Sequence, residues 1–235
     1  MLDFTFDVYN LRLLSALVML TLAAAIDIRK REINDSLWIA FGLLAVALIF
    51  FEHDQTNALK TLGISLIIAP VALVIWRIGI FGGADALGLI VLAALAPNIT
   101  ASGNIITPFT TLTNAAILST VPLFVNFIRN GIAISNHENI FEDFDETRLK
   151  KIAAIFLGYR SRNPKYSFSI EKTSGNNKKL DFSLRNVEHT HFCNSSNTWV
   201  TPGIPYMLYI ASGFIMQLLL GDIIFNTLGN FLTRA

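Results

Sequence analysis

Charged residues are scarce in this sequence. Asp, Glu, Lys and Arg make up 15% of the 235 residues, and hydrophobic residues make up 53%. A soluble domain has about a quarter charged residues, so the shortage predicts a membrane protein surrounded by a lipid bilayer. The charges nearly cancel, to a net charge of +1, which gives no reason to expect nucleic acid as a partner.

Cysteine and histidine are also rare. The single cysteine, Cys193, excludes an internal disulfide. No HExxH motif is present, which excludes the usual zinc site of an intramembrane metalloprotease. All four histidines fall in expected loops, which excludes a Ser–His protease site inside the membrane: they are His53, His137, His189 and His191. His189, His191 and Cys193 alternate as on one strand face and could bind zinc, but no fourth ligand is apparent. We therefore expect no metal and no cofactor.

Apolar runs, by contrast, are long. A membrane-spanning helix needs about 20 mostly apolar residues, and residues 58–96 are too long for one span and about right for two. The expected spans are 8–26, 37–51, 58–76, 84–96, 112–128 and 203–228. The fold class we expect is an α-helical polytopic membrane protein with six transmembrane helices.

The basic residues predict how these spans are oriented. They follow span one (DIRKRE, 27–32) and span three (Arg77), and 11 of the 18 Lys and Arg residues lie in 129–200. Positive charge favours the cytoplasmic side, so we expect both termini to lie outside the cytoplasmic membrane and residues 129–200 to lie in the cytoplasm. Asp222 is expected at the outer interface.

Three domain segments follow from this topology. Residues 1–128 form the membrane domain with spans one to five, and residues 201–235 complete it with the sixth span. Residues 129–200 are expected to form a small cytoplasmic α+β domain. Its helix is expected at 146–157 and its strands at 166–171 and 180–184, with a turn at SGNNKK (174–179).

Two aspartates fall at matching places in this topology. Asp27 ends span one and Asp85 opens span four, so both are expected at the cytoplasmic ends of their helices. Two carboxylates that lie close together do not both ionise easily and hold a shared proton. One can then take a proton from water while the other gives one to a peptide carbonyl or leaving amine.

Small residues beside the aspartates favour their close approach. Ala23 and Ala24 precede Asp27 on the same helical face, and Gly88 follows Asp85 by three residues. Each aspartate also has a simpler interpretation. Asp85 could cap the start of its helix, and Asp27 could belong to a solvated loop.

Three motifs resemble those of prepilin-type peptidases. The segment DIRKREIN (27–34), followed by Trp38, resembles the segment after the first catalytic aspartate of these enzymes. GGAD (82–85) resembles the second aspartate motif of the GxGD-type membrane aspartyl proteases. WVTPGIP (199–205) resembles the archaeal branch, the preflagellin (prearchaellin) peptidases. Ala84 replaces the last glycine of the GxGD pattern, which also favours that branch.

The resemblance implies an activity. It implies an aspartic endopeptidase that removes the class III signal peptide, a short basic leader, from preflagellin or prepilin precursors at the cytoplasmic membrane face. Asp27 and Asp85 carry over as the catalytic pair. The supporting motif positions are Asn34, Gly82, Gly83, Ala84 and Gly88. The four-cysteine zinc module of bacterial members is missing, so cleavage is the whole implied activity.

An acidic run in the insert offers a surface for such a leader. HENIFEDFDE (137–146) contains Glu142, Asp143, Asp145 and Glu146, which could attract basic residues or form an ordinary solvated face. A different class of function also stays open at this point. A small transporter or channel could use Asp27 and Asp85 as proton or cation sites.

Overall fold

The computed structural model describes residues 7–97, 107–142, 144–174, 177–182, 191–224 and 227. The chain divides into two compact units. The first comprises Met1–Ser119 with Pro205–Ala235, and the second comprises Thr120–Ile204. The second unit is wider than the expected insert at 129–200, because it also contains a helix that begins at Val121.

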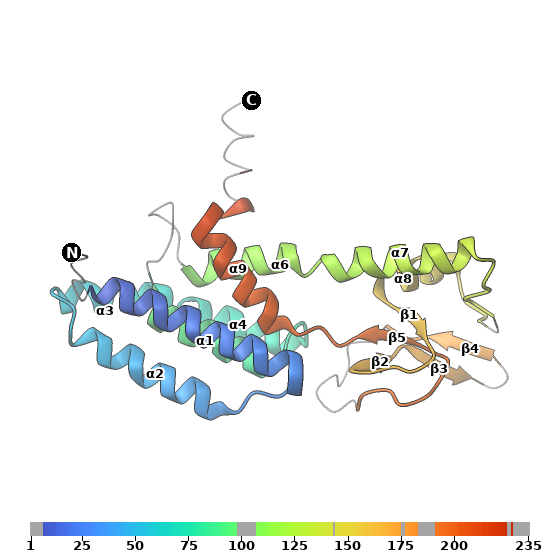
Figure 1. Cartoon of the computed structure of the whole chain (residues 1–235), viewed down its shortest axis with the longest axis horizontal. Helices are drawn as coiled ribbons and strands as arrows, with labels where there is room; N and C mark the ends of the chain where they lie inside the picture. The colour runs from blue at the N-terminus through green and yellow to red at the C-terminus, as the bar shows by residue number, and fades with distance from the viewer. Residues whose placement is uncertain are drawn as a thin grey trace, which may run out of the picture. The chain divides into compact units, whose positions relative to one another are not determined.

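Helices form the described part of the first unit (Figure 1). In chain order they are α1 (Val8–Lys30), α2 (Asp35–Ile49), α3 (Gln55–Ser65), α4 (Ile68–Ile78), α5 (Gly83–Leu95), α6 (Thr107–Leu118) and α9 (Tyr206–Leu220). Helix α9 packs against α6 and α1, and α5 packs against α2 and α4. The last helix therefore contacts the first, although the second unit separates them in the sequence.

Within the part of the chain that the structure describes, three helical segments are long and apolar enough to cross a membrane. They are Val8–Lys30, Gln55–Ile78 and Thr107–Ser135, and they coincide with the first, third and fifth expected spans. The other three expected spans coincide with the shorter apolar helices α2, α5 and α9. The protein is thus a helical membrane protein, and the number of six spans stays a prediction.

The long apolar run at 58–96 breaks near the glycines, as expected. Helix α4 ends at Gly79, whose φ of 82° is left-handed, a conformation that glycine adopts without steric cost. Helix α5 begins at Gly83. A second interruption, at Leu66, separates α3 from α4. Pro70 lies four residues after Leu66, and a proline has no N–H to bond the carbonyl four residues before it. The sequence analysis did not use this signal.

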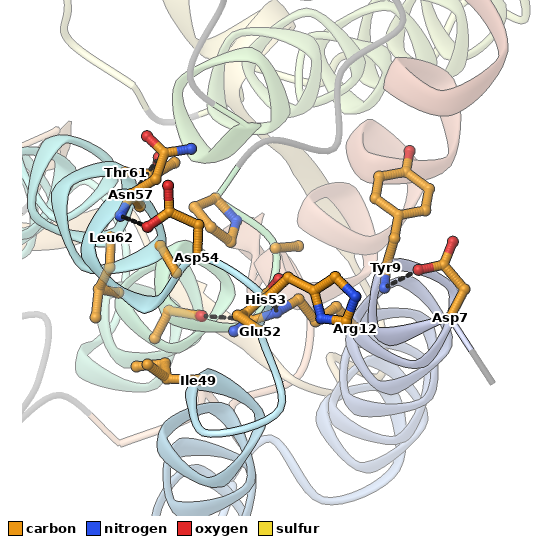
Figure 2. Close-up of a pocket in the computed structure, with 14 residues that line it drawn as sticks. Asp7, Tyr9, Arg12, Ile49, Glu52, His53, Asp54, Asn57, Thr61 and Leu62 are labelled. Carbon is orange, nitrogen blue, oxygen red and sulfur yellow. Dashed lines mark hydrogen bonds and ion pairs between the residues drawn. The ribbon is translucent and has the colours of Figure 1, made fainter.

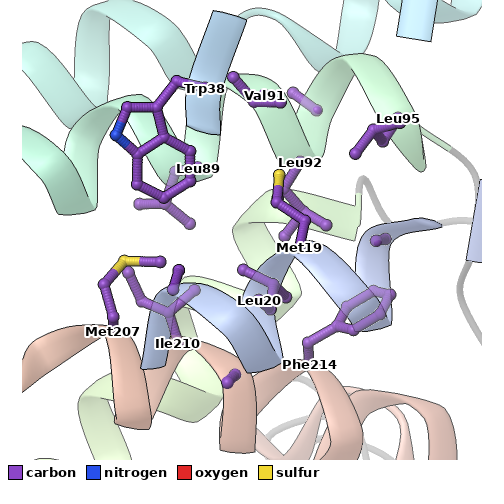
Figure 3. Close-up of a cluster of buried hydrophobic side chains, with 14 of the residues drawn as sticks. Met19, Leu20, Trp38, Leu89, Val91, Leu92, Leu95, Met207, Ile210 and Phe214 are labelled. Atoms are coloured by element: carbon purple, nitrogen blue, oxygen red, sulfur yellow. The ribbon is translucent and has the colours of Figure 1, made fainter. Parts of the chain in front are cut away.

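The core of the first unit lies where α1, α2, α5 and α9 meet (Figure 3). Helix α1 contributes Met19 and Leu20, and α2 contributes Trp38. The remaining large side chains come from α5 and α9: Leu89, Leu92, Leu95, Met207, Ile210 and Phe214. All are at least 96% buried, so this core fixes the helices that carry both aspartates.

The second unit combines two helices with short antiparallel strands. Its helices are α7 (Val121–Ser135) and α8 (Arg148–Leu157). A three-stranded sheet has the order β1-β5-β2, and β3 pairs with β4 in a hairpin. The strands are β1 (Tyr159–Ser161), β2 (Ser167–Ser169), β3 (Glu171–Ser174), β4 (Asn177–Leu180) and β5 (Thr198–Pro202).

Trp199 organises the core of this unit from the central strand β5. Its side chain is fully buried, and its Nε1 donates a hydrogen bond of 2.7 Å to the carbonyl oxygen of Ile140. Its ring stacks on Phe141 with 4.9 Å between the centroids. Trp199 is the first residue of the WVTPGIP motif. The start of this motif therefore stabilises the core of the second unit.

The strands of the second unit differ from the expected ones. The expected strand at 166–171 is divided into β2 and the start of β3, and β4 ends at Leu180. The expected strand at 180–184 begins where β4 ends, and residues 183–184 lie outside the described part. The turn at 174–179 is tighter than expected, since Lys178 and Lys179 already pair with β3.

Candidate active site

Asp27 lies in the last turns of α1 and is half-buried. Its Oδ2 accepts a hydrogen bond of 3.2 Å from the backbone N–H of Met207, the second residue of α9. The first backbone N–H groups of a helix have no partner within the helix, and the helix dipole favours an anion there. Asp27 is therefore held at the start of another helix and is not part of a solvated loop.

Asp85 lies in the first turn of α5 with a relative exposure of 7%. Its Oδ2 accepts a hydrogen bond of 2.9 Å from the backbone N–H of Gly82. This contact is the cap that the simpler interpretation expected. A cap formed by one carboxylate oxygen does not exclude a chemical role for the same group.

The start of α9 brings the surroundings of the two aspartates together. Met207 binds Asp27 through its backbone, and its side chain lies beside Gly88, one turn after Asp85. Tyr206 stacks on Phe81, with 5.4 Å between the ring centroids. The carboxylates of Asp27 and Asp85 interact electrostatically.

The glycines around Asp85 make room for neighbouring helices. A Cβ atom on Gly83 would lie 3.3 Å from the indole of Trp76. A Cβ atom on Gly88 would lie 3.0 Å from Cε of Met207 and 3.2 Å from the ring of Trp38. Both distances are tighter than ordinary packing, so large side chains at these positions would push the helices apart.

The other supporting motif positions have local tasks. Asn34 is the N-cap of α2, and its Oδ1 accepts the N–H of Ser36 at 2.9 Å. Gly82 supplies the N–H that binds Asp85. Ala84 is half-buried and packs against the core of the first unit.

Sequence reasoning missed Phe81, Tyr206 and Met207. Tyr206 directly follows the WVTPGIP motif, and that position was the available signal. The motif was used only to recognise the archaeal branch. Met207 contacts Asp27, which lies 180 residues earlier in the chain. This contact depends on helix packing, which a local sequence pattern does not predict.

The acidic run of the second unit is only partly free for a ligand. Glu142 and Asp145 are exposed, and Asp143 lies outside the described residues. Glu146 is occupied, because its carboxylate binds Lys150 at 3.0 Å and accepts the N–H of Leu180 at 2.8 Å. Although burial acts to raise it, these two hydrogen bonds hold the pKa of Glu146 below its usual value.

The alternating His and Cys residues form no evident metal site. His191 is exposed, whereas Cys193 is buried, and the N–H of Cys193 donates to the Ser167 carbonyl at 2.7 Å. His189 lies outside the described residues. Among the residues that the structure describes, no three His, Cys, Asp or Glu side chains are grouped as metal ligands.

A polar pocket of about 270 Å³ lies at the opposite end of α1 from Asp27 (Figure 2). Arg12 is one of its lining residues, and its Nε binds Oε1 of Glu52 at 2.8 Å. The guanidinium also donates to the carbonyl oxygens of Ala94 and Leu95, at 3.1 and 3.0 Å. Arg12 thus holds the C-terminal end of α5, the helix whose first turn carries Asp85.

The far end of α9 is fixed by buried polar contacts to α6. Thr111 donates to Gln217 at 2.7 Å, and Asn114 donates to the Gly221 carbonyl at 3.0 Å. Asp222 is fully buried and accepts a hydrogen bond of 3.1 Å from Thr113. This partner is not visible in the hydropathy of the sequence, and the expected location of Asp222 at the outer interface stays a prediction.

Comparison with known proteins agrees with this architecture. Residues 14–127 match the family model described as type IV leader peptidase family. Residues 126–223 match the model described as archaeal peptidase A24 C-terminus type II. The two matches meet near the start of the second unit.

Two relatives are named preflagellin peptidase. The protein from Methanocaldococcus jannaschii is 24% identical over 218 residues, which cover 86% of this chain and 91% of the relative. The protein from Methanococcus maripaludis is 26% identical over 222 residues, which cover 89% and 94%. These matches lead to one conclusion: residues 14–127 are similar to the type IV leader peptidase family, and residues 126–223 are similar to the archaeal peptidase A24 C-terminus.

Proposed function

We propose that this protein is a membrane aspartyl endopeptidase that removes the class III signal peptide from preflagellin or prepilin-like precursors at the cytoplasmic membrane face. The observation that carries the proposal is the position of Asp27 and Asp85. Asp27 accepts the N–H of Met207 at the start of α9, and Asp85 lies in the first turn of α5; the two carboxylates interact electrostatically. The relatives named preflagellin peptidase support the substrate class.

The chemistry requires a water molecule between the two carboxylates. One carboxylate accepts a proton from the water as its oxygen attacks the peptide carbonyl carbon, and the other donates a proton to the carbonyl oxygen. Proton transfer to the amine then accompanies breakage of the C–N bond, and the pair returns to its starting state. The hydrogen bonds from Met207 and Gly82 orient one oxygen of each carboxylate.

Cleavage of a precursor by membranes that contain each variant tests the pair. Asp27→Asn and Asp85→Asn keep the size of the side chain but remove its acid–base function. We expect each to lower the cleavage rate by on the order of 10²–10⁴-fold. The shift in precursor size on a gel measures this rate.

Asp35→Asn is the matched control, because Asp35 is an exposed aspartate in the first turn of α2. It should cleave at the wild-type rate. Wild-type cleavage by either Asp27→Asn or Asp85→Asn, at equal protein levels, would reject the two-aspartate mechanism.

A further inference from the structure

We propose that α8 of the second unit is an interfacial membrane helix, and that its exposed apolar face lies on a bilayer surface that contains anionic lipid. This surface, here called the α8 face, consists of Leu149, Ile152, Phe156 and Leu157. The inference concerns attachment to lipid and does not depend on the proposed catalytic pair.

The α8 face is apolar and uncovered in the second unit. Leu149 is 79% exposed and Ile152 is 53% exposed, and Phe156 and Leu157 are also exposed. Leu149, Ile152 and Phe156 recur at helical spacing on one side of α8. The opposite side supplies Ala154 to the core, so Leu149 and Ile152 are not needed for that core.

The α8 face continues onto a helix that belongs to a candidate span. Phe156 stacks on Phe127 of α7, with 5.0 Å between ring centroids and an interplanar angle of 12°. Phe127 lies within the apolar segment Thr107–Ser135. Its neighbours on α7, Phe124 and Ile128, are 61% and 60% exposed. If α7 enters the bilayer, the C-terminal end of α8 reaches the same depth.

The carbonyl groups at the C-terminal end of α8 are hydrogen-bonded by protein side chains, as a helix end without access to water requires. Asn130 donates to the carbonyl oxygens of Ile155 and Gly158 at 2.8 and 2.7 Å, and Asn126 donates to that of Phe156 at 3.0 Å. Both asparagines are at least 96% buried. Terminal carbonyls in water need no such partners, whereas in lipid every backbone polar group must be satisfied by the protein.

Basic residues at the other end of α8 indicate which surface it contacts. Arg148, Lys150 and Lys151 occupy its first turn. Positive charge there opposes the helix dipole. Lys150 is paired with Glu146, which leaves Arg148, an exposed residue, and Lys151 as the charges available to lipid headgroups. A basic end beside an apolar face is typical of a helix that lies in an anionic membrane interface.

Spin labels on the full chain in vesicles test the proposal. Leu149→Cys and Ile152→Cys place a label on the α8 face, and Ser169→Cys, exposed on β2, places a matched label away from it. Cys193 is buried, so the parent chain without an added cysteine measures the background. Oxygen and a water-soluble nickel complex report contact of each label with lipid and with water.

In vesicles of phosphatidylcholine with phosphatidylglycerol, we expect nickel accessibility at positions 149 and 152 to be several-fold lower than at 169, and oxygen accessibility to be higher. In phosphatidylcholine alone, the difference should shrink. Retained precursor cleavage by the labelled variants shows that they are folded. Equal nickel accessibility at all three positions would overturn the proposal. So would protection that appears only after precursor is added, because the α8 face would then bind the substrate instead of lipid.

Discussion

At Gly88 of α5, side chains from two other helices approach the backbone. Gly88 has no Cβ atom. A Cβ at this position would lie against Met207 of α9 and Trp38 of α2. A group much larger than a methyl here would displace the start of α9, where Asp27 is bound. The sequence analysis expected Gly88 to favour close packing, but it did not identify which helices would meet there.

Substitutions at Gly88 should therefore depend steeply on size. Gly88→Ala adds a Cβ that the flexible end of Met207 can avoid, and alanine favours the helix by about 1 kcal/mol, so we expect stability and cleavage near wild type. Gly88→Leu should lower the free energy of unfolding by about 1–3 kcal/mol and strongly reduce cleavage. Thermal unfolding in detergent and precursor cleavage measure these effects.

Gly42→Leu is the control for this series. Gly42 lies on α2, and nothing lies within 4 Å of its ideal Cβ position, so the same substitution should be tolerated there. Unchanged unfolding and cleavage in Gly88→Leu would show that the close approach at Gly88 is unimportant.

At the scale of elements, α5 is held at both ends. Gly82 and Asp85 bind each other at its start, and Arg12 binds the Ala94 and Leu95 carbonyls at its end. The Arg12 side chain is only 8% exposed, whereas that of Glu52 is 31% exposed. Arg12 is therefore a positioning residue that acts through α5.

Removal of Arg12 should loosen α5 without touching the aspartates. Arg12→Gln leaves two carbonyls and the Glu52 carboxylate with poorer partners, so we expect a loss of about 1–3 kcal/mol in the free energy of unfolding, together with slower cleavage. Arg12→Gln combined with Glu52→Gln should recover part of this loss, since no unpaired carboxylate then remains. Thermal unfolding of the single and double variants measures the coupling.

Lys60→Gln serves as the comparison, because Lys60 is an exposed basic residue on the neighbouring helix α3. It should unfold as wild type does. An Arg12→Gln variant that behaves like Lys60→Gln would mean that the end of α5 needs no such support.

The elements that could be predicted are those whose signal lies in residues close together in the sequence. The break between α4 and α5 follows from Gly79 and the glycines at 82–83, and Asp27 and Asp85 stand out because carboxylates are rare beside apolar runs. β1 and β5 were missed because strands of three and five residues show too little alternation to detect. The binding of Asp27 to Met207 joins distant segments, and so it depends on tertiary packing.

At the scale of the whole molecule, the proposal assigns different tasks to the two units. The first carries Asp27 and Asp85, and the second carries Glu142 and Asp145, two of the exposed members of the acidic run. A basic leader would be attracted by those two carboxylates over a range that salt shortens. An ordinary solvated face would show no such dependence.

Neutralising this surface should affect substrate binding more than turnover. For a precursor with a basic leader, Glu142→Gln with Asp145→Asn should raise KM several-fold at low salt and leave kcat unchanged. The increase should shrink at high salt. A precursor whose leader lysines are replaced by glutamine is the control, and it should not distinguish the variant from the wild type. An unchanged KM with the basic leader would leave the acidic run as a solvated face.

The position of α9 also has a consequence for the order in which the protein is made. Asp27 is synthesised 180 residues before Met207, the residue that binds it. While the ribosome is still producing the second unit, α1 and α5 are already present, but the amide that orients Asp27 does not yet exist. On the proposed mechanism, the nascent chain carries both acids without an assembled centre. Proteolytic competence is then acquired only when the final helix enters the membrane, so an unfinished chain cannot attack neighbouring precursors.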